Sequence, residues 1–399
     1  MFSLFLVQGA NYLAPLLVLP YLSRVLGLDG FGTIAIVLSA CAVALIFTDF
    51  GFNLSATYWI AKNINNRKEI SYHIGAIFII KSIICLFLVL GVIIFNLFFT
   101  DLTYLSFSIL VCLVIIAQSF QSIWFFQGIE KMKNVTLLTV IAKLSYMALV
   151  FIFVSTHSDV NIVLICLTVS NLISSFVSVF LIYKEGYEIK LPNTPYIWSV
   201  FKGSTPFFLS RAAVGLYTSA SAFIVGSIGG VQQAALYSSA EKLYQAGQGL
   251  TSPITQALFP YISRSGDIKI LYRLVSFLLV PISIVFTFAY FYSEQILVLF
   301  YGPDFSNSSD ILRLFLICLV VTFISVNFGY PAFSSIGRVD IANKTVMFAA
   351  LIQMLIISIL IFMNKVSAYN IAMSVLFVES VVMLIRVFVF FKMKHKSSI

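Results

Sequence analysis

Stretches of about twenty mostly apolar residues recur along the whole chain, and short polar segments separate them. An apolar run of this length matches a helix that crosses the hydrocarbon core of a bilayer. Only 10% of the residues are charged, against about 25% in soluble domains. The sequence therefore predicts an all-α integral membrane protein. The twelve runs occupy residues 4–26, 31–60, 74–98, 104–126, 135–155, 160–183, 206–228, 233–262, 274–293, 311–336, 345–363 and 370–391.

The segments between these runs alternate between basic and acidic. One set carries sixteen of the 24 basic residues: Lys62, Arg67, Lys68, Lys131, Lys133, Lys184, Lys190, Lys202, Arg264, Lys269, Arg273, Arg338, Lys344, Lys392, Lys394 and Lys396. The other set carries mainly acids: Asp29, Asp101, Asp159, Glu294, Asp304 and Asp310. Because cytoplasmic loops are enriched in Lys and Arg, we expect both termini in the cytoplasm. The net charge of +9 is thus a topology signal, and no nucleic-acid partner is expected.

The longest connection divides the twelve runs into six and six. We expect an N-terminal lobe at 1–183, a cytoplasmic linker at 184–205, a C-terminal lobe at 206–391 and a basic tail at 392–399. A faint internal repeat agrees with this division, since Gly27-Leu28-Asp29-Gly30 aligns with Gly226-Ser227-Ile228-Gly229. Two repeated halves with both ends on one side predict two six-helix lobes around a central substrate cavity.

Charged residues inside the apolar runs are the main candidates for function. The stretch from Phe47 to Lys62 places Asp49 deep in a run, where an ionisable group costs about 2.5–3.5 kcal/mol. Such groups are tolerated when they face a wet cavity or pair with each other. The substrate-binding candidates are Arg24, Lys81, Lys143, Arg211 and Lys242. The candidates for ion coupling are Asp49, Glu241 and Glu379.

This set leans towards positive charge, which favours a cationic vestibule for an anion with a bulky polar body. The alternative is that each side chain pairs locally or extends to a lipid headgroup. We favour that alternative for Arg386 and Arg313 and leave both readings open for Glu241 and Lys242. Polar residues that could line a wet lumen are Asn11, Tyr12, Gln118, Gln121, Asn171 and Gln245.

The sequence lacks the motifs that mark several classes of function. The sequence has no Gly-x4-Gly-Lys-Ser/Thr phosphate loop and no metal-binding motif, so we expect neither ATP hydrolysis nor a metal or other cofactor. The five cysteines lie singly inside apolar runs and are expected to be core residues. No catalytic residues are identified, and the short outer segments argue against an enzyme. The first run precedes the first basic residue, Arg24, and is expected to remain as a span.

Three motifs carry a family resemblance. The first is Leu19-Pro20-Tyr21-Leu22-Ser23-Arg24-Val25-Leu26-Gly27, followed by Asp29-Gly30-Phe31-Gly32. The second is Asp49-Phe50-Gly51-Phe52-Asn53-Leu54-Ser55-Ala56-Thr57, and the third is Phe300-Tyr301-Gly302-Pro303-Asp304-Phe305. With these motifs, the chain resembles the Wzx-type O-antigen flippases. These belong to the polysaccharide-transporter branch of the multidrug/oligosaccharidyl-lipid/polysaccharide exporter superfamily.

The resemblance implies a multidrug-exporter-like fold in the bacterial inner membrane. It also implies a substrate, an oligosaccharide repeat unit on undecaprenyl pyrophosphate, moved from the cytoplasmic to the periplasmic leaflet. Arg and Lys suit its pyrophosphate, while the lipid tail stays among the membrane lipids. The resemblance leaves open whether transport is coupled to H⁺ or Na⁺, or is driven by downstream consumption of the transported product. A polysaccharide polymerase and a chain-length regulator are candidate partners.

Two other functions remain as alternatives. A multidrug or toxin antiporter of the same fold would take organic cations, and its site should lean acidic and aromatic rather than basic. A membrane-embedded polysaccharide polymerase would have as many spans but a large outer loop with basic residues, whereas the outer segments here are short and acidic.

Overall fold

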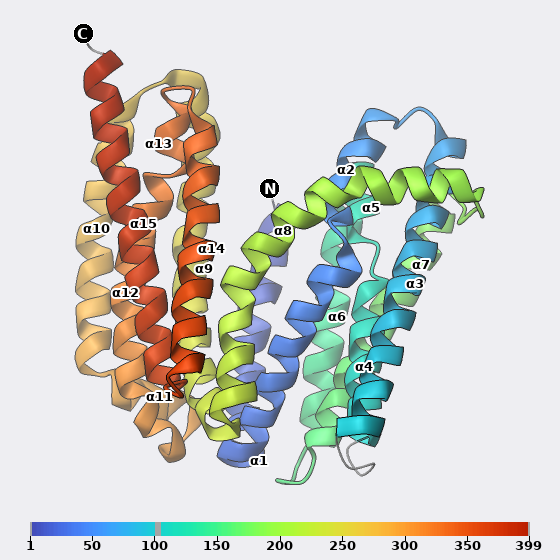
Figure 1. Ribbon diagram of the computed structural model, residues 1–399, viewed down its shortest axis with the longest axis horizontal. Helices are drawn as coiled ribbons and strands as arrows, with labels where there is room; N and C mark the ends of the chain where they lie inside the picture. Colours follow the sequence, from blue (N-terminus) through green and yellow to red (C-terminus); the bar gives the residue numbers. More distant parts are fainter. Residues whose placement is uncertain (1, 100–104, 398–399) are drawn as a thin grey trace. The chain divides into compact units, whose positions relative to one another are not determined.

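The structure is a computed structural model that describes the backbone of residues 2–99 and 105–397, and every regular element in these ranges is helical (Figure 1). The first part of the chain forms α1 (Phe2–Asp49), α2 (Phe52–Lys62), α3 (Arg67–Phe99), α4 (Leu105–Ser119), α5 (Ile123–Gly128), α6 (Met132–Phe153), α7 (Val160–Lys184) and α8 (Thr194–Gly229). The second part forms α9 (Val231–Ser265), α10 (Ile268–Phe291), α11 (Ser293–Tyr301), η2 (Pro303–Ser308), α12 (Ser309–Asn327), α13 (Tyr330–Ser334), α14 (Val339–Phe362) and α15 (Ala368–Ser397).

These helices form two compact units. Unit 1 consists of Met1–Leu26 and Val37–Gly215, and unit 2 consists of Gly27–Ile36 and Leu216–Ile399. The chain first passes from unit 1 to unit 2 at a kink inside α1, where Gly27 has a φ of 69°. Only glycine adopts such a conformation routinely, and this explains why the first motif has glycine at position 27.

Nine stretches of the described residues are long and apolar enough to cross a membrane. The sequence predicts twelve crossings, and the difference arises at two places. Ala14–Lys62 forms one continuous apolar stretch although the chain bends at Gly27. Helices α8 and α9 cover the predicted runs 206–228 and 233–262, and within their described side chains Ala220–Gly229 in α8 forms a shorter apolar segment. The helical class is confirmed, whereas the count of twelve stays a prediction.

Three of the predicted runs are interrupted. The run 31–60 breaks at Phe50 and Gly51, between α1 and α2. The run 104–126 breaks after Ser119, between α4 and α5. The run 311–336 breaks at Phe328 and Gly329, between α12 and α13. Broken helices inside a membrane are tolerated where protein groups satisfy the freed backbone.

The core of unit 1 joins α2, α3 and α5 with the connection that follows α7. Its large buried side chains are Phe52, Ile74, Ile77, Trp124, Phe125, Phe126 and Ile182. Tyr187 in the connection is buried in the same cluster, and the Lys190 amide donates to the Ser71 carbonyl at 3.3 Å. The carbonyl of Lys190 occupies the place that a Cβ on Gly75 would need. The segment expected to be a linker therefore packs closely on unit 1.

Unit 2 has its own core. Near the start of the unit, the Phe31 ring packs edge-on against Tyr301 and Phe305, with ring centroids 5.6 and 5.2 Å apart. A second cluster joins α9, α10, α12, α13 and α15, and includes Leu258, Ile262, Leu271, Phe323, Phe333 and Phe390. The turn from α9 to α10 follows from the local sequence. Gly266 ends α9 at a φ of 64°, and the Asp267 carboxylate caps α10 by accepting from the amides of Lys269 and Ile270.

A single carboxylate stabilises the connection between α6 and α7. Asp159 accepts hydrogen bonds from the backbone amides of Ser155 and Thr156, each at 2.8 Å. These two amides stabilise the charged form and lower the pKa of the Asp159 carboxyl below its usual value.

Candidate functional site

The main polar cluster of unit 1 lies at two helix ends. Helix α1 ends at Asp49 and helix α4 ends at Ser119. The Ser119 hydroxyl donates to the Thr48 hydroxyl at 2.8 Å, so the two ends are in direct contact. Asn53, in the first turn of α2, donates from its side-chain amide to Asp49 Oδ1 at 2.8 Å. Thr48 and Ser119 lie 71 residues apart in the chain, so the two breaks that follow them are neighbours in the fold.

Lys81 of α3 lies between these two ends. Its side chain is almost completely buried, and its Nζ donates to the Ser119 carbonyl at 2.7 Å. The same Nζ is 4.0 Å from Asp49 Oδ1 and 6.0 Å from the centre of the Phe52 ring. The terminal carbonyls of a helix lack intrahelical partners and carry partial negative charge, so a cation is stabilised there. The buried ammonium thus has both a carboxylate and a helix end as partners.

The break between α1 and α2 depends on aromatic packing. Phe50 has a φ of 46°, which is unusual for a bulky residue. Its ring stacks on Phe201 and Phe208 of α8, with both centroid distances at 4.6 Å. Gly51 follows with a φ of 73°, and a Cβ there would lie 2.6 Å from the Phe208 amide nitrogen. The Asp-Phe-Gly sequence of the second motif therefore ends α1 and allows α8 to pack closely against the break.

Other expected site residues of unit 1 lie elsewhere. Arg24 on α1 and Arg211 on α8 are exposed, and Lys143 on α6 is half-buried. Of the five substrate-binding candidates and three coupling candidates, the structure brings Asp49 and Lys81 together.

Helix α8 also makes a buried polar contact with α2, where the Ser55 and Ser204 hydroxyls lie 2.9 Å apart.

In unit 2, the expected charged residues lie on α9 and α15. Glu241 is buried, with 8% of its surface exposed, while the Nζ of the adjacent Lys242 donates to Gln245 Oε1 at 2.9 Å. Glu379 is half-buried on α15. Around Tyr244 of α9, the Gln248 side-chain amide donates to the tyrosine hydroxyl at 2.7 Å, and the Cys318 thiol of α12 donates to it at 3.6 Å.

Arg386 is a buried cation that sequence reasoning assigned to the membrane surface or to a local pair. Its guanidinium donates to the Thr345 hydroxyl at 2.9 Å and to the carbonyl and hydroxyl of Ser325 at 3.0 and 3.1 Å. It is therefore paired inside unit 2 rather than extended to a headgroup. Local pairing was one of the two outcomes expected for Arg386, which lies a few residues before the end of the last run.

The polar residues expected to line a lumen give a mixed result. The Gln121 side-chain amide donates to Asn171 Oδ1 at 2.8 Å, and Asn171 is buried between α4 and α7. The buried Oε1 of Gln118 has no hydrogen-bond partner among the described residues. The side chains of Asn11 and Tyr12 lie outside the described part of the chain.

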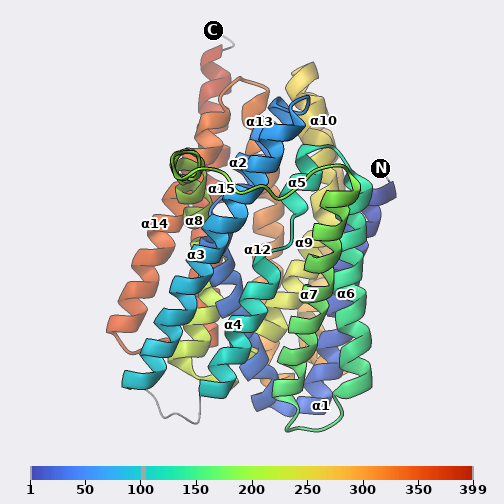
Figure 2. The same cartoon turned by 90° about the vertical axis from the view of Figure 1, so that its right-hand side faces the viewer.

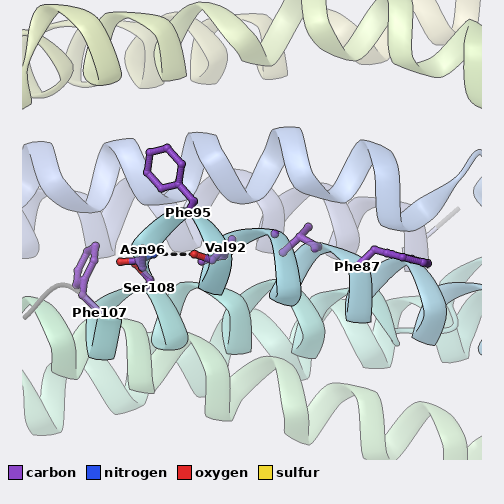
Figure 3. Close-up of a pocket in the computed structure, with 8 residues that line it drawn as sticks. Phe87, Val92, Phe95, Asn96, Phe107 and Ser108 are labelled. Carbon is purple, nitrogen blue, oxygen red and sulfur yellow. Dashed lines mark hydrogen bonds between the residues drawn. The ribbon is translucent and has the colours of Figure 1, made fainter. Parts of the chain in front are cut away.

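An apolar groove of about 520 Å³ runs between α3 and α4. Figure 3 shows two of its lining residues, Asn96 and Ser108, close to each other, while the Phe95 ring points away from Ser108. Asn96 donates to the Val92 carbonyl at 2.9 Å, and the Ser108 hydroxyl donates to Asn96 Oδ1 at 3.2 Å. The lining has no charged residue, so the groove is separate from the polar cluster.

Within the described residues, no group of three or more His, Cys, Asp or Glu side chains is placed to hold a metal ion. The five cysteines are all free and buried, in agreement with their expected role as core residues.

Solved structures with a similar fold are transporters of one superfamily. The lipid II flippase MurJ in its inward closed conformation matches with a TM-score of 0.72 over 97% of this chain and 86% of its own, at 15% identity. An inward-facing multidrug resistance MATE transporter of the MOP superfamily matches at 0.69 over 98% and 95%, also at 15% identity. A MOP superfamily transporter from Pyrococcus furiosus matches at 0.63 over 98% and 94%, at 13% identity. The expected multidrug-exporter-like fold is thereby confirmed.

Sequence comparison defines the family more narrowly. The model of a family described as "Polysaccharide biosynthesis protein" matches residues 1–266, and the chain belongs to this family. A protein of Shigella dysenteriae named "Putative O-antigen transporter" is 29% identical over 96% of both chains. A protein of the same name from Escherichia coli K12 is 31% identical over 64% of this chain and 62% of its own. The resemblance carried by the three motifs is thereby confirmed.

Proposed function

We propose that the protein is a flippase for undecaprenyl-pyrophosphate-linked O-antigen repeat units, moving them from the cytoplasmic to the periplasmic leaflet of the bacterial inner membrane. The observation that carries this proposal is the similarity to the Shigella dysenteriae O-antigen transporter, which spans 96% of both chains. The fold that the chain shares with a lipid II flippase supports a lipid-linked substrate. The protein then moves its substrate without changing a covalent bond and is not an enzyme.

The pyrophosphate of such a substrate needs cationic partners. Guanidinium groups bind phosphate oxygens in pairs, and ammonium groups bind them as point charges. Arg211 and Arg24 are exposed and so accessible to a ligand, whereas Lys143 and Lys242 are half-buried. Lys81 is the weakest of the five candidates, because its ammonium already has Ser119 and Asp49 as partners. We assign the leading role to Arg211.

Coupling to an ion gradient requires a carboxylate that binds and releases the ion during transport. Asp49, Glu241 and Glu379 are the candidates, and a proton or Na⁺ is the ion. Asp49 leads this set because it touches both a buried cation and the break between α1 and α2. A polymerase and a chain-length regulator, which use the product, are the proposed protein partners.

The proposed arrangement in the membrane has two lobes, 1–183 and 206–391, with the linker 184–205, the tail 392–399 and both termini in the cytoplasm. The alternation of basic and acidic connections supports this orientation.

Deletion of the gene tests the proposal. We expect loss of surface polysaccharide, with lipid-linked repeat units retained in the cytoplasmic leaflet. When the gene is supplied on a plasmid, surface polysaccharide should return and the retained units should disappear. Sensitivity to organic cations in the deletion strain, with normal surface polysaccharide, would instead favour a multidrug antiporter. Lipid-linked single units that reach the periplasmic leaflet but are not joined would favour a polymerase.

A further inference from the structure

Two short helices at the basic end of unit 1 pack as a pair. The Thr57 hydroxyl of α2 donates to the Trp124 carbonyl of α5 at 3.0 Å. A Cβ on Gly128 of α5 would lie 2.8 Å from Ile60 Cβ of α2, so the two backbones approach closely. Figure 2 shows α2 and α5 at the same end of unit 1, and both pack in the core of the unit beside the first part of α3. Each short helix is joined to a longer one, α1 or α4, through one of the two breaks.

The two breaks form one junction. Thr48 and Ser119 hold the ends of α1 and α4 together, so α2 and α5 leave the body of unit 1 at neighbouring points. In a continuous helix, the Ser119 carbonyl would accept from the amide four residues later. At the break, Lys81 donates to this carbonyl instead. The same ammonium reaches Asp49 at the end of α1, so one side chain is in contact with both sides of the junction.

Unit 2 contains a related arrangement. The end of α12 is followed by a break and the short helix α13, and Arg386 donates to the Ser325 carbonyl close to that end. Helix α13 packs on α9, which runs without interruption from Val231 to Ser265. The counterpart of α13 in unit 1, α5, packs on α2, which a break separates from α1. A buried cation at a helix break thus occurs in both units, but only unit 1 has two adjoining breaks among the described residues.

We propose that α2 and α5 move as one element about the two breaks, and that Lys81 is the positioning residue that fixes their angle to the body of unit 1. A rotation at the two neighbouring junctions slides α2 and α5 over the first part of α3, on which they pack in the core, and leaves the helical hydrogen bonds of α3, α6 and α7 intact. Loss or transfer of the Lys81 contacts would release the pair from both junctions together. The inference concerns the packing of unit 1 and holds for any substrate that the protein carries.

Distances between spin labels on the purified full-length protein test this proposal. All five native cysteines are buried, and the introduced sites Tyr58→Cys on α2, Glu130→Cys after α5, Leu144→Cys on α6 and Phe176→Cys on α7 are exposed or largely exposed. In the Lys81→Met variant, we expect the 58–144 distance to shift by roughly 2 Å or more, the size of known helix shifts. The 58–130 and 144–176 distances should stay as in the wild type. Lys81→Arg, which keeps the charge, should restore the 58–144 distance.

Two further variants make the result decisive. Arg386→Met removes the buried cation of unit 2 and should leave all three distances unchanged. Thr48→Val removes only the link between the two helix ends, and should shift the 58–144 distance in the same direction if Lys81→Met does not yield folded protein. An unchanged 58–144 distance in the folded variant would overturn the proposal. So would a change in the 58–130 distance, because α2 and α5 would then not move together, and so would a change in the 144–176 distance.

Discussion

Arg211 lies on α8 three residues after Phe208, whose ring stacks on Phe50 at the break between α1 and α2. Its exposed guanidinium is therefore close in sequence to the junction and accessible to a ligand. Hydrogen bonds to charged groups contribute about 1.5–3 kcal/mol. We expect Arg211→Ala to lower polysaccharide export at least about tenfold, since 1.4 kcal/mol corresponds to tenfold. Arg211→Lys keeps the charge but not the paired geometry, and should retain part of the export.

A matched control is available in another arginine. Arg313 is paired with Asp310 at 2.8 Å on the surface of unit 2, and exposed ion pairs contribute about 0–1 kcal/mol. Arg313→Ala should therefore export at nearly the wild-type rate. Export by Arg211→Ala at the wild-type rate, with equal protein in the membrane, would remove Arg211 from the anion site.

Asp49 offers a second test at the level of one residue. Asparagine keeps an oxygen that can accept from Asn53, but it cannot ionise or balance the charge of Lys81. We expect Asp49→Asn to slow transport and to flatten its dependence on pH, measured with lipid-linked substrate in reconstituted vesicles. Asp304→Asn serves as the control and should keep the wild-type profile. If Asp49→Asn transports like the wild type at every pH, then Glu241 and Glu379 become the coupling candidates to test.

At the scale of helices, the turn between α1 and α2 depends on a residue without a side chain. Gly51 has a φ of 73°, which costs other residues about 1–2 kcal/mol, and the α8 backbone leaves no room for a Cβ. We expect Gly51→Ala to lower the Tm of the purified protein. Gly203→Ala in α8 meets open space and should leave the Tm unchanged or slightly higher. Equal Tm values for the two variants would contradict the close approach of α8 to this turn.

The loop before α7 should respond to pH through Asp159. Because its pKa is lowered in the folded protein, its contribution to stability is present above the usual pKa of an aspartate and is lost as the pH falls through the lowered value. At neutral pH, Asp159→Asn should therefore raise hydrogen exchange of the Ser155 and Thr156 amides. Corrected for intrinsic rates, the difference from the wild type should vanish at acid pH. A difference that persists there would mean that the carboxylate charge is not what closes the loop.

The sequence predicted which segments are helical because apolar length is a strong local signal. It missed the breaks at Phe50–Gly51 and after Ser119, since hydropathy stays high through a break. Charge and depth marked Asp49 and Lys81 as unusual, but they could not show that the two residues meet. That contact depends on the rotation of α3 and on where α1 and α4 end. Local pairing was expected for Arg386, but the sequence could not name its partners, which lie on α12 and α14.

At the scale of the whole molecule, the number of crossings decides where the ends of α8 and α9 lie. With nine crossings, α8 and α9 do not span, and the turn between them at Gly230 shares a side with Lys68 and Lys133. With twelve, α8 crosses and α9 returns, so this turn lies on the opposite side. The kink at Gly27 gives a second point of difference, because Asp29 follows it in the sequence. The basic loops share one side under either count, so the positions of this turn and of Asp29 decide between nine and twelve.

Thiol labelling of single introduced cysteines distinguishes the two counts, since the native cysteines are buried. Gln232→Cys and Asp29→Cys are exposed positions, and we expect both to react with an impermeant reagent added to spheroplasts. Lys68→Cys and Lys133→Cys, also exposed, should react only after the membrane is permeabilised. If Gln232→Cys behaved like Lys68→Cys, α8 and α9 would not cross the membrane. The polar side chains of α9, Glu241 and Lys242 among them, would then lie outside the transport path, and the anion and coupling sites would rest on unit 1 and α15.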